Sequence, residues 1–114
     1  MSEPQGKLQI KVARGNIYIP HETYEVYLKN IEAVALLSHE NGILLIPLIT
    51  DSAGGLLLKI KNLRGDRIVH AQEFFRFNNY LEEFEEKLYE VKWESERAAL
   101  LIIDVAISEK LTPA

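Results

Sequence analysis

The chain repeats part of itself, and this repeat constrains the fold more than any other feature. Residues 7–27 align without a gap on residues 57–77, at an offset of 50. The identical pairs are Leu8 with Leu58, Ile10 with Ile60, Lys11 with Lys61, Arg14 with Arg64, and Gly15 with Gly65. The apolar run 43–46 also resembles the run 100–103. A repeat of this kind predicts two copies of one structural unit.

The chain length predicts a single domain that spans residues 1–114 and can bury one modest core. The first unit covers residues 7–50 and the second covers residues 56–108, with a glycine-containing linker at 51–55. The second unit is longer because of an acidic insertion around 82–87. Two like units packed against each other predict a barrel with a pseudo-twofold axis.

Alternation of apolar and polar residues over 8–12 indicates a half-buried strand. Gly15 and Asn16 favour a tight turn, because both residues tolerate positive φ, and 17–19 would be the returning strand. Pro20 stops the ladder and suits the start of a short helix over 21–28. Asn41-Gly42 between the apolar runs 33–37 and 43–48 predicts a hairpin.

The second unit repeats this plan. The pattern predicts a strand over 56–60, a turn over 62–66, a strand over 67–69 and a short helix over 71–77. The fold class is therefore mostly β with short helices (α+β).

A longer helix is expected over residues 79–91. Asn79 followed by Glu82 has the spacing of a capping box. Apolar residues then recur at helical spacing, at Tyr80, Leu81, Phe84, Leu88 and Val91, with acidic residues mostly on the opposite face. The runs 91–93 and 99–105 predict a closing hairpin after this helix.

Composition excludes several classes of function. The chain has no cysteine, which excludes disulfides and thiolate chemistry. The segment Met1–Gly6 is polar, unlike a signal peptide, and no apolar run reaches the roughly 20 residues of a membrane helix. We therefore expect a cytoplasmic protein. The three histidines and the serines stand in no catalytic or metal-binding pattern, so we expect neither an enzyme nor a cofactor.

Charge is strongly segregated along the chain. Segments 7–17 and 57–67 together hold seven basic residues and one acid, Asp66, which gives them a charge of +6. The rest of the chain carries −10. A basic surface at equivalent positions of both units indicates an anionic partner.

Residues 15–22, Gly-Asn-Ile-Tyr-Ile-Pro-His-Glu, resemble the signature of the swapped-hairpin AbrB superfamily, in which alternating β-branched residues and Ile-Pro precede a short helix. Tyr27-Leu28 matches the end of that helix, and the Asn41-Gly42 hairpin matches the end of the unit. Two units in one chain resemble the arrangement of the MraZ family. The resemblance covers residues 7–48 well and residues 57–105 weakly.

The resemblance implies a swapped-hairpin, double-split β-barrel and a non-catalytic DNA-binding transcriptional regulator. In this superfamily, basic residues of the first strand, its turn and the start of the helix contact double-stranded DNA. The matching residues here are Lys7, Lys11, Arg14, Lys59, Lys61, Arg64 and Arg67. MraZ-like proteins also form rings, so homo-oligomers agree with the resemblance.

A second hypothesis is a non-catalytic protein-interaction or assembly module that keeps the barrel without binding DNA. Its contact surfaces would be the sheet edges or the acidic helix 79–91. A small-molecule binder or an enzyme forms a third class. The aromatic residues Phe74, Phe75, Phe77, Phe84 and Trp93 could form a stacking surface, although core packing explains them more simply.

Overall fold

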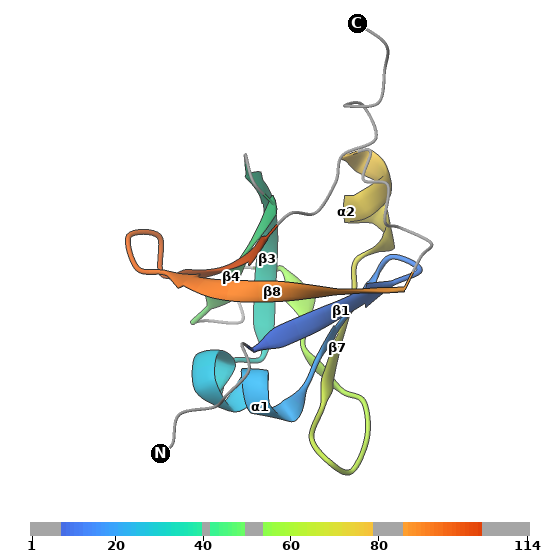
Figure 1. The fold of residues 1–114 in the computed structure, drawn as a ribbon, viewed down its shortest axis with the longest axis vertical. Coiled ribbons are helices and arrows are strands. Elements are labelled where there is room, and N and C mark those ends of the chain that lie inside the picture. Colours follow the sequence, from blue (N-terminus) through green and yellow to red (C-terminus); the bar gives the residue numbers. More distant parts are fainter. Residues whose placement is uncertain (1–7, 40–41, 50–53, 79–85, 104–114) are drawn as a thin grey trace, which may run out of the picture.

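A single antiparallel sheet dominates the fold and curls into a nearly closed barrel (Figure 1). The structure is a computed structural model that describes residues 8–39, 42–49, 54–78 and 86–103. In these residues, nine strands follow the order β5-β3-β4-β9-β8-β1-β2-β7-β6. The predicted fold class, mostly β with short helices, is confirmed.

The strands are β1 (Gln9–Ala13), β2 (Asn16–Ile19), β3 (Ala33–His39), β4 (Gly42–Leu48), β5 (Leu56–Leu57), β6 (Lys59–Ile60), β7 (Arg67–His70), β8 (Lys87–Glu94) and β9 (Ala99–Ile103). The helices are α1 (His21–Thr23), which continues into the π-helical turn η1 (Tyr24–Leu28), and α2 (Gln72–Phe77). The helix α1 and the loop between β6 and β7 lie at one end of the molecule, and α2 lies towards the other (Figure 1).

The two outermost strands of the sheet, β5 and β6, are consecutive in the chain and separated only by Leu58. β5 pairs with β3, whereas β6 pairs with β7. Leu58 is buried, and its backbone N–H donates to the Glu32 carbonyl at 2.9 Å. One kinked strand therefore joins the two ends of the sheet and almost closes the barrel.

The core follows from the alternation along the strands. Ile10 and Val12 of β1, and Ile17 and Ile19 of β2, are completely buried, as is Phe75 of α2. Full burial of an aliphatic or phenylalanine side chain contributes about 1.5–3 kcal/mol, so this cluster supplies much of the driving force for folding. The aromatic residues are divided: Phe75 is in the core, whereas Phe77 is 87% exposed.

The register of the central strand pairs agrees with the sequence repeat. β2 pairs with β7 so that Tyr18 lies opposite Ile68, its equivalent at the offset of 50. β4 pairs with β9 so that Leu44 lies opposite Leu101, its equivalent when 43–46 is aligned with 100–103. A twofold axis through both strand pairs would produce this register.

Each turn contacts the start of the other unit's helix. In one direction, Ala71 N–H donates to the Gly15 carbonyl at 3.0 Å, and the Gln72 side chain donates to the Arg14 carbonyl at 3.0 Å. In the other direction, His21 N–H donates to the Asp66 carboxylate at 2.8 Å. The two halves of the chain are therefore interleaved rather than packed side by side.

The prediction of a helix over 79–91 is wrong for its described part. Residues 87–94 form β8, which pairs with β1 on one side and β9 on the other. Tyr89 and Val91 are buried while Leu88 and Glu90 are exposed, a period of two. Leu88 and Val91 fit a helical period, whereas Tyr89 and Val91 fit the strand period. Two flanking strands satisfy the backbone hydrogen bonds of this segment, so the tertiary context selects the strand.

The remainder of that predicted helix, including Asn79, Tyr80, Leu81, Glu82 and Phe84, lies outside the described residues. The closing hairpin is confirmed as β8 and β9, and the earlier strands and short helices lie within a few residues of their predicted bounds. Pro47 lies in β4 beyond the residues that pair with β9. Among the described residues it therefore has a strand neighbour on one side only, as expected for proline.

Candidate functional site

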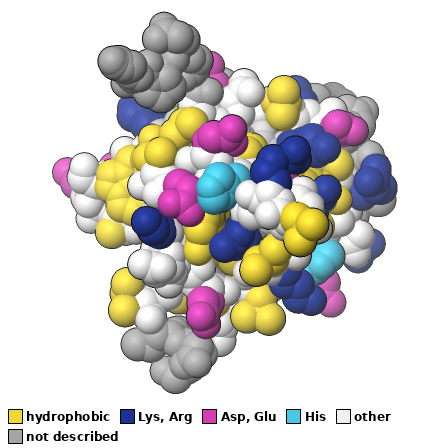
Figure 2. Space-filling model, turned by 90° about the horizontal axis from the view of Figure 1, so that it is seen from below, with side chains coloured by type: hydrophobic (Ala, Val, Ile, Leu, Met, Phe, Trp, Pro, Cys, Tyr) yellow, Lys and Arg dark blue, Asp and Glu magenta, His cyan; other side chains and the backbone are white. Residues whose placement is uncertain are grey.

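Three of the seven predicted DNA-contacting residues meet in one surface groove of about 480 Å³ at the α1 end of the barrel. We call it the Tyr18 groove. It is lined by Lys11, Tyr18, Ile19, Pro20, Glu22, Lys61, Arg64, Asp66 and Leu88. Figure 2 views the molecule from this end, where Lys and Arg side chains gather on one half of the face with acidic groups interspersed.

Tyr18 brings the two lysines of the groove together. The ammonium of Lys11 lies 5.0 Å from the centre of the Tyr18 ring, and that of Lys61 lies 5.6 Å from it. Such cation–π contacts contribute about 0.5–1 kcal/mol at exposed sites. Lys11 also lies 3.3 Å from the Glu86 carboxylate, whereas Lys61 forms no ion pair with a described carboxylate. Lys61 therefore carries charge that is available to an anionic ligand.

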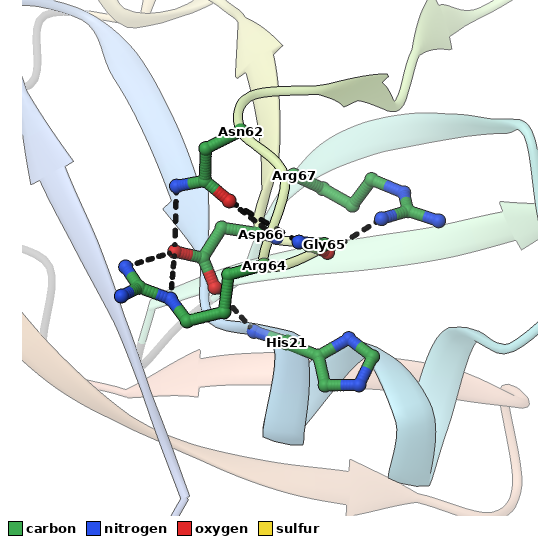
Figure 3. A network of polar contacts seen from close by, with 6 residues as sticks. All are labelled: His21, Asn62, Arg64, Gly65, Asp66 and Arg67. Atoms are coloured by element: carbon green, nitrogen blue, oxygen red, sulfur yellow. Dashed lines mark hydrogen bonds and ion pairs between the residues drawn. The ribbon is translucent and has the colours of Figure 1, made fainter.

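Asp66 organises the loop beside these lysines (Figure 3). One oxygen accepts from Arg64 Nη2 at 2.7 Å and Nε at 3.2 Å, and from the Asn62 amide at 3.0 Å. The other oxygen accepts from the backbone N–H of His21, one of the helix-start donors that have no partner within the helix.

The hydrogen bonds from Arg64 and Asn62, with that from His21, hold the pKa of Asp66 well below its usual range, and Asp66 in turn raises the pKa of Arg64. The carboxylate is thus ionised at neutral pH. It compensates part of the Arg64 charge and fixes the guanidinium beside the groove, although the Arg64 side chain stays 74% exposed. Asp66 is therefore a structural part of the loop rather than a free acid on the surface.

The other predicted residues lie elsewhere. Lys59 and Arg67 line a second hollow beside Tyr24. Arg14 is exposed at the β1–β2 turn, where φ is +53°. Lys7 lies outside the described residues. The predicted set is thus split between the Tyr18 groove, a second hollow and a separate turn.

Sequence reasoning did not single out Tyr18 or Tyr24, although each holds cations in place. The repeat could have pointed to Tyr18, since the offset of 50 places it opposite Ile68 on the expected axis. Tyr24 reads as an ordinary apolar residue of a helix, and nothing in the sequence indicates that Arg67 stacks on it with the guanidinium 3.9 Å from the ring centre.

The histidines have separate environments. His70 Nδ1 lies 3.2 Å from the Asn16 amide oxygen, whereas the His21 ring packs against Gly65. Among the residues that the structure describes, no group of three or more His, Cys, Asp or Glu side chains could hold a metal ion. In the same part of the chain, no helix has the length and apolar character to cross a membrane.

No protein-family model matches the chain, and no curated protein or solved structure matches it either. The function must therefore be inferred from the residues and their geometry.

Proposed function

We propose that the chain is a non-catalytic DNA-binding transcriptional regulator of the AbrB type, with two tandem units as in MraZ, acting in the cytoplasm. One observation carries the proposal. Lys11 of the first unit and Lys61 and Arg64 of the second line the same groove around Tyr18. Lys11 is 50 residues from Lys61 and 53 residues from Arg64 in sequence, and the interleaved strands bring all three cations to one surface.

Phosphate binding is the chemistry that this surface supports best. Each phosphate neutralised by a Lys or Arg side chain releases counterions from DNA, which makes affinity depend steeply on salt. Asp66 engages Arg64 through Nε and Nη2, so the remaining guanidinium N–H groups are available to a phosphate oxygen. When double-stranded DNA lies across the groove, a phosphate would replace the Glu86 carboxylate as the ion-pair partner of Lys11.

The proposal is tested by fluorescence anisotropy of a mixed-sequence duplex titrated with the protein at roughly 50 and 200 mM salt. We expect affinity to fall by orders of magnitude between the two salts. The variant Lys11→Gln/Lys61→Gln should reduce the slope of log affinity against log salt by about two, since each lost phosphate contact removes about one.

The matched control is Lys29→Gln/Lys92→Gln, which removes the same charge from exposed lysines outside the groove. It should retain most of the salt slope. Absence of binding at the lower salt would contradict the proposal. Equal losses in both double variants would show that net charge, rather than this groove, governs the interaction.

A protein-interaction or assembly module is the second candidate, and one observation favours it. Trp93 is 37% exposed and stacks on Tyr27 with ring centres 5.9 Å apart, while the adjacent Val26 is 61% exposed. Exposed aromatic and apolar groups are enriched at interface centres. If this surface joins copies of the chain, Trp93→Ala should shift the mass measured by light scattering towards the monomer.

A further inference from the structure

The second hollow differs in character from the Tyr18 groove. It has a volume of about 730 Å³ and lies between the kinked β5–β6 strand and the segment that follows η1. Its apolar lining includes Ile31, Leu57 and Ile60, and its charged lining is Glu32, Lys59 and Arg67. The volume falls in the range of small-ligand sites, which combine apolar walls with a few placed polar groups.

Arg67 is fixed in this hollow without a carboxylate partner among the residues that the structure describes. Its guanidinium lies 3.9 Å from the centre of the Tyr24 ring, and Nη1 donates to the Gly65 carbonyl. Tyr24 is only 7% exposed, and its hydroxyl accepts the Asn30 N–H at 3.1 Å, so the platform beneath Arg67 is rigid. Arg64 and Arg97 each pair with an acid, whereas Arg67 forms no ion pair with any described carboxylate.

The walls beside Arg67 are apolar and exposed. Leu57 is 59% exposed and Ile60 is 70% exposed. Glu32 is the single acid among the described residues that line the hollow, against the two cations Lys59 and Arg67. A hydrated phosphodiester would leave these walls uncovered, whereas a carboxylate carried on an alkyl chain would satisfy Arg67 and cover them.

We propose that this hollow binds a small monocarboxylate with an apolar chain. The carboxylate accepts from the N–H groups of Arg67, whose planar fork suits bidentate recognition, and the chain packs against Leu57 and Ile60. Lys59 adds a second positive charge at the rim. The site shares no lining residue with the Tyr18 groove, so it stands independently of DNA binding.

The test is an NMR titration of the isotope-labelled protein with hexanoate, and with 1-hexanol as the uncharged match. We expect shifts at Leu57, Ile60 and Arg67, with hexanoate binding about tenfold or more tightly than hexanol, because a hydrogen bond to a charged group is worth roughly 1.5–3 kcal/mol. Equal affinity for the two probes, or no shifts at these residues, would overturn the proposal.

Two substitutions locate the contacts. Arg67→Gln should abolish the preference for hexanoate, while Arg64→Gln, a matched change in the Tyr18 groove, should leave it intact. Persistence of the preference in Arg67→Gln would overturn the proposal.

Because Arg67 also packs on Tyr24, Ile60→Glu provides a second probe at an exposed position. It should weaken hexanoate binding by charge repulsion, while Leu63→Glu, on the same hairpin but outside the hollow, should not. Equal effects of these two substitutions would count against the site. Salt-dependent DNA binding is also measured on Arg67→Gln. Because the two sites share no lining residue, failure of one proposal leaves the other standing.

Discussion

Asp66 connects the two units at the scale of a single residue. Its carboxylate caps the first N–H of α1 in one unit and holds Asn62 and Arg64 of the other. The side chain is 16% exposed, so these contacts are partly shielded from water. Loss of the carboxylate would release the 62–66 loop and leave a helix-start donor without its acceptor.

Asp66→Ala should lower the free energy of unfolding by about 1 kcal/mol or slightly more at neutral pH, the usual effect of losing a helix cap. Asp66→Asn is the control, since it keeps an oxygen for His21 N–H but loses the charge that Arg64 contacts. We expect its stability to lie between those of the parent and the alanine variant, as measured by urea denaturation. An alanine variant as stable as the parent would contradict the cap.

Acid should weaken the same interaction. The folded pKa of Asp66 is lowered, so the ionised carboxylate stabilises the fold above its unfolded pKa of about 3.9. That contribution is lost as the pH falls from about 4 towards the folded pKa. Unfolding curves for the parent and Asp66→Asn should therefore differ at neutral pH and converge as the pH falls. A difference in stability between the parent and Asp66→Asn that stays constant across this pH range would contradict the contribution of the ionised Asp66 carboxylate.

Gly15 is required where the β1–β2 turn meets α2. Its φ is +80°, and an added Cβ would lie 2.6 Å from Gln72 Cγ and 2.9 Å from Gln72 Cα. Gly54 has a similar φ of +85° with nothing within 4 Å, so Gly54→Ala measures backbone strain alone, about 1–2 kcal/mol. Gly15→Ala should be clearly more destabilising in thermal unfolding. Equal losses of stability in Gly15→Ala and Gly54→Ala would contradict the close approach of Gly15 to Gln72.

At the scale of the element, β9 places neighbouring side chains on opposite faces of the sheet. Leu100 is completely buried, whereas the adjacent Leu101 is partly exposed. Leu100→Ala should lower the free energy of unfolding by about 2–5 kcal/mol, the range for buried leucine, and Leu101→Ala by clearly less. Chemical denaturation of the two variants checks the alternation, and similar losses would contradict the described register.

Most elements could be predicted from sequence because their signals are local. The turn at Gly15, the helix after Pro20 and the hairpin before Ile43 depend on residues that are adjacent in the chain. The segment around Leu88 could not be assigned in this way. Its apolar residues fit a helical and a strand period, and the choice depends on β1 and β9, which are distant in sequence.

The candidate site was predictable in its charge but not in its geometry. The repeat placed Lys11 and Lys61 at equivalent basic positions, and the fold brings both of them, with Arg64, to one groove. The separation of Arg67 depends on its stacking with Tyr24, a tertiary contact without a sequence pattern. The structural role of Asp66 also escapes sequence reasoning, because its partner His21 is 45 residues away.

For the whole molecule, the interleaved strands predict that neither half folds alone as a monomer. β1, β2 and β4 of the first unit pair with β8, β7 and β9 of the second. A fragment that ends in the 51–55 linker should form a homodimer, with Tyr18 of one copy opposite Tyr18 of the other. Light scattering and circular dichroism check this, and a folded monomer would contradict the proposed repeat.

The turns at Gly15 and Gly65 carry different side chains, so the two sides of the barrel axis are not equivalent. A homodimer of one unit would present the same turn on both sides of its axis, so a bound molecule could be reversed without changing its contacts. Here one turn carries Asn16, which contacts His70, and the other carries Asp66, which holds Arg64. An extended ligand that crosses the axis between Tyr18 and Ile68 therefore meets different side chains at its two ends. Its two binding orientations have unequal energies.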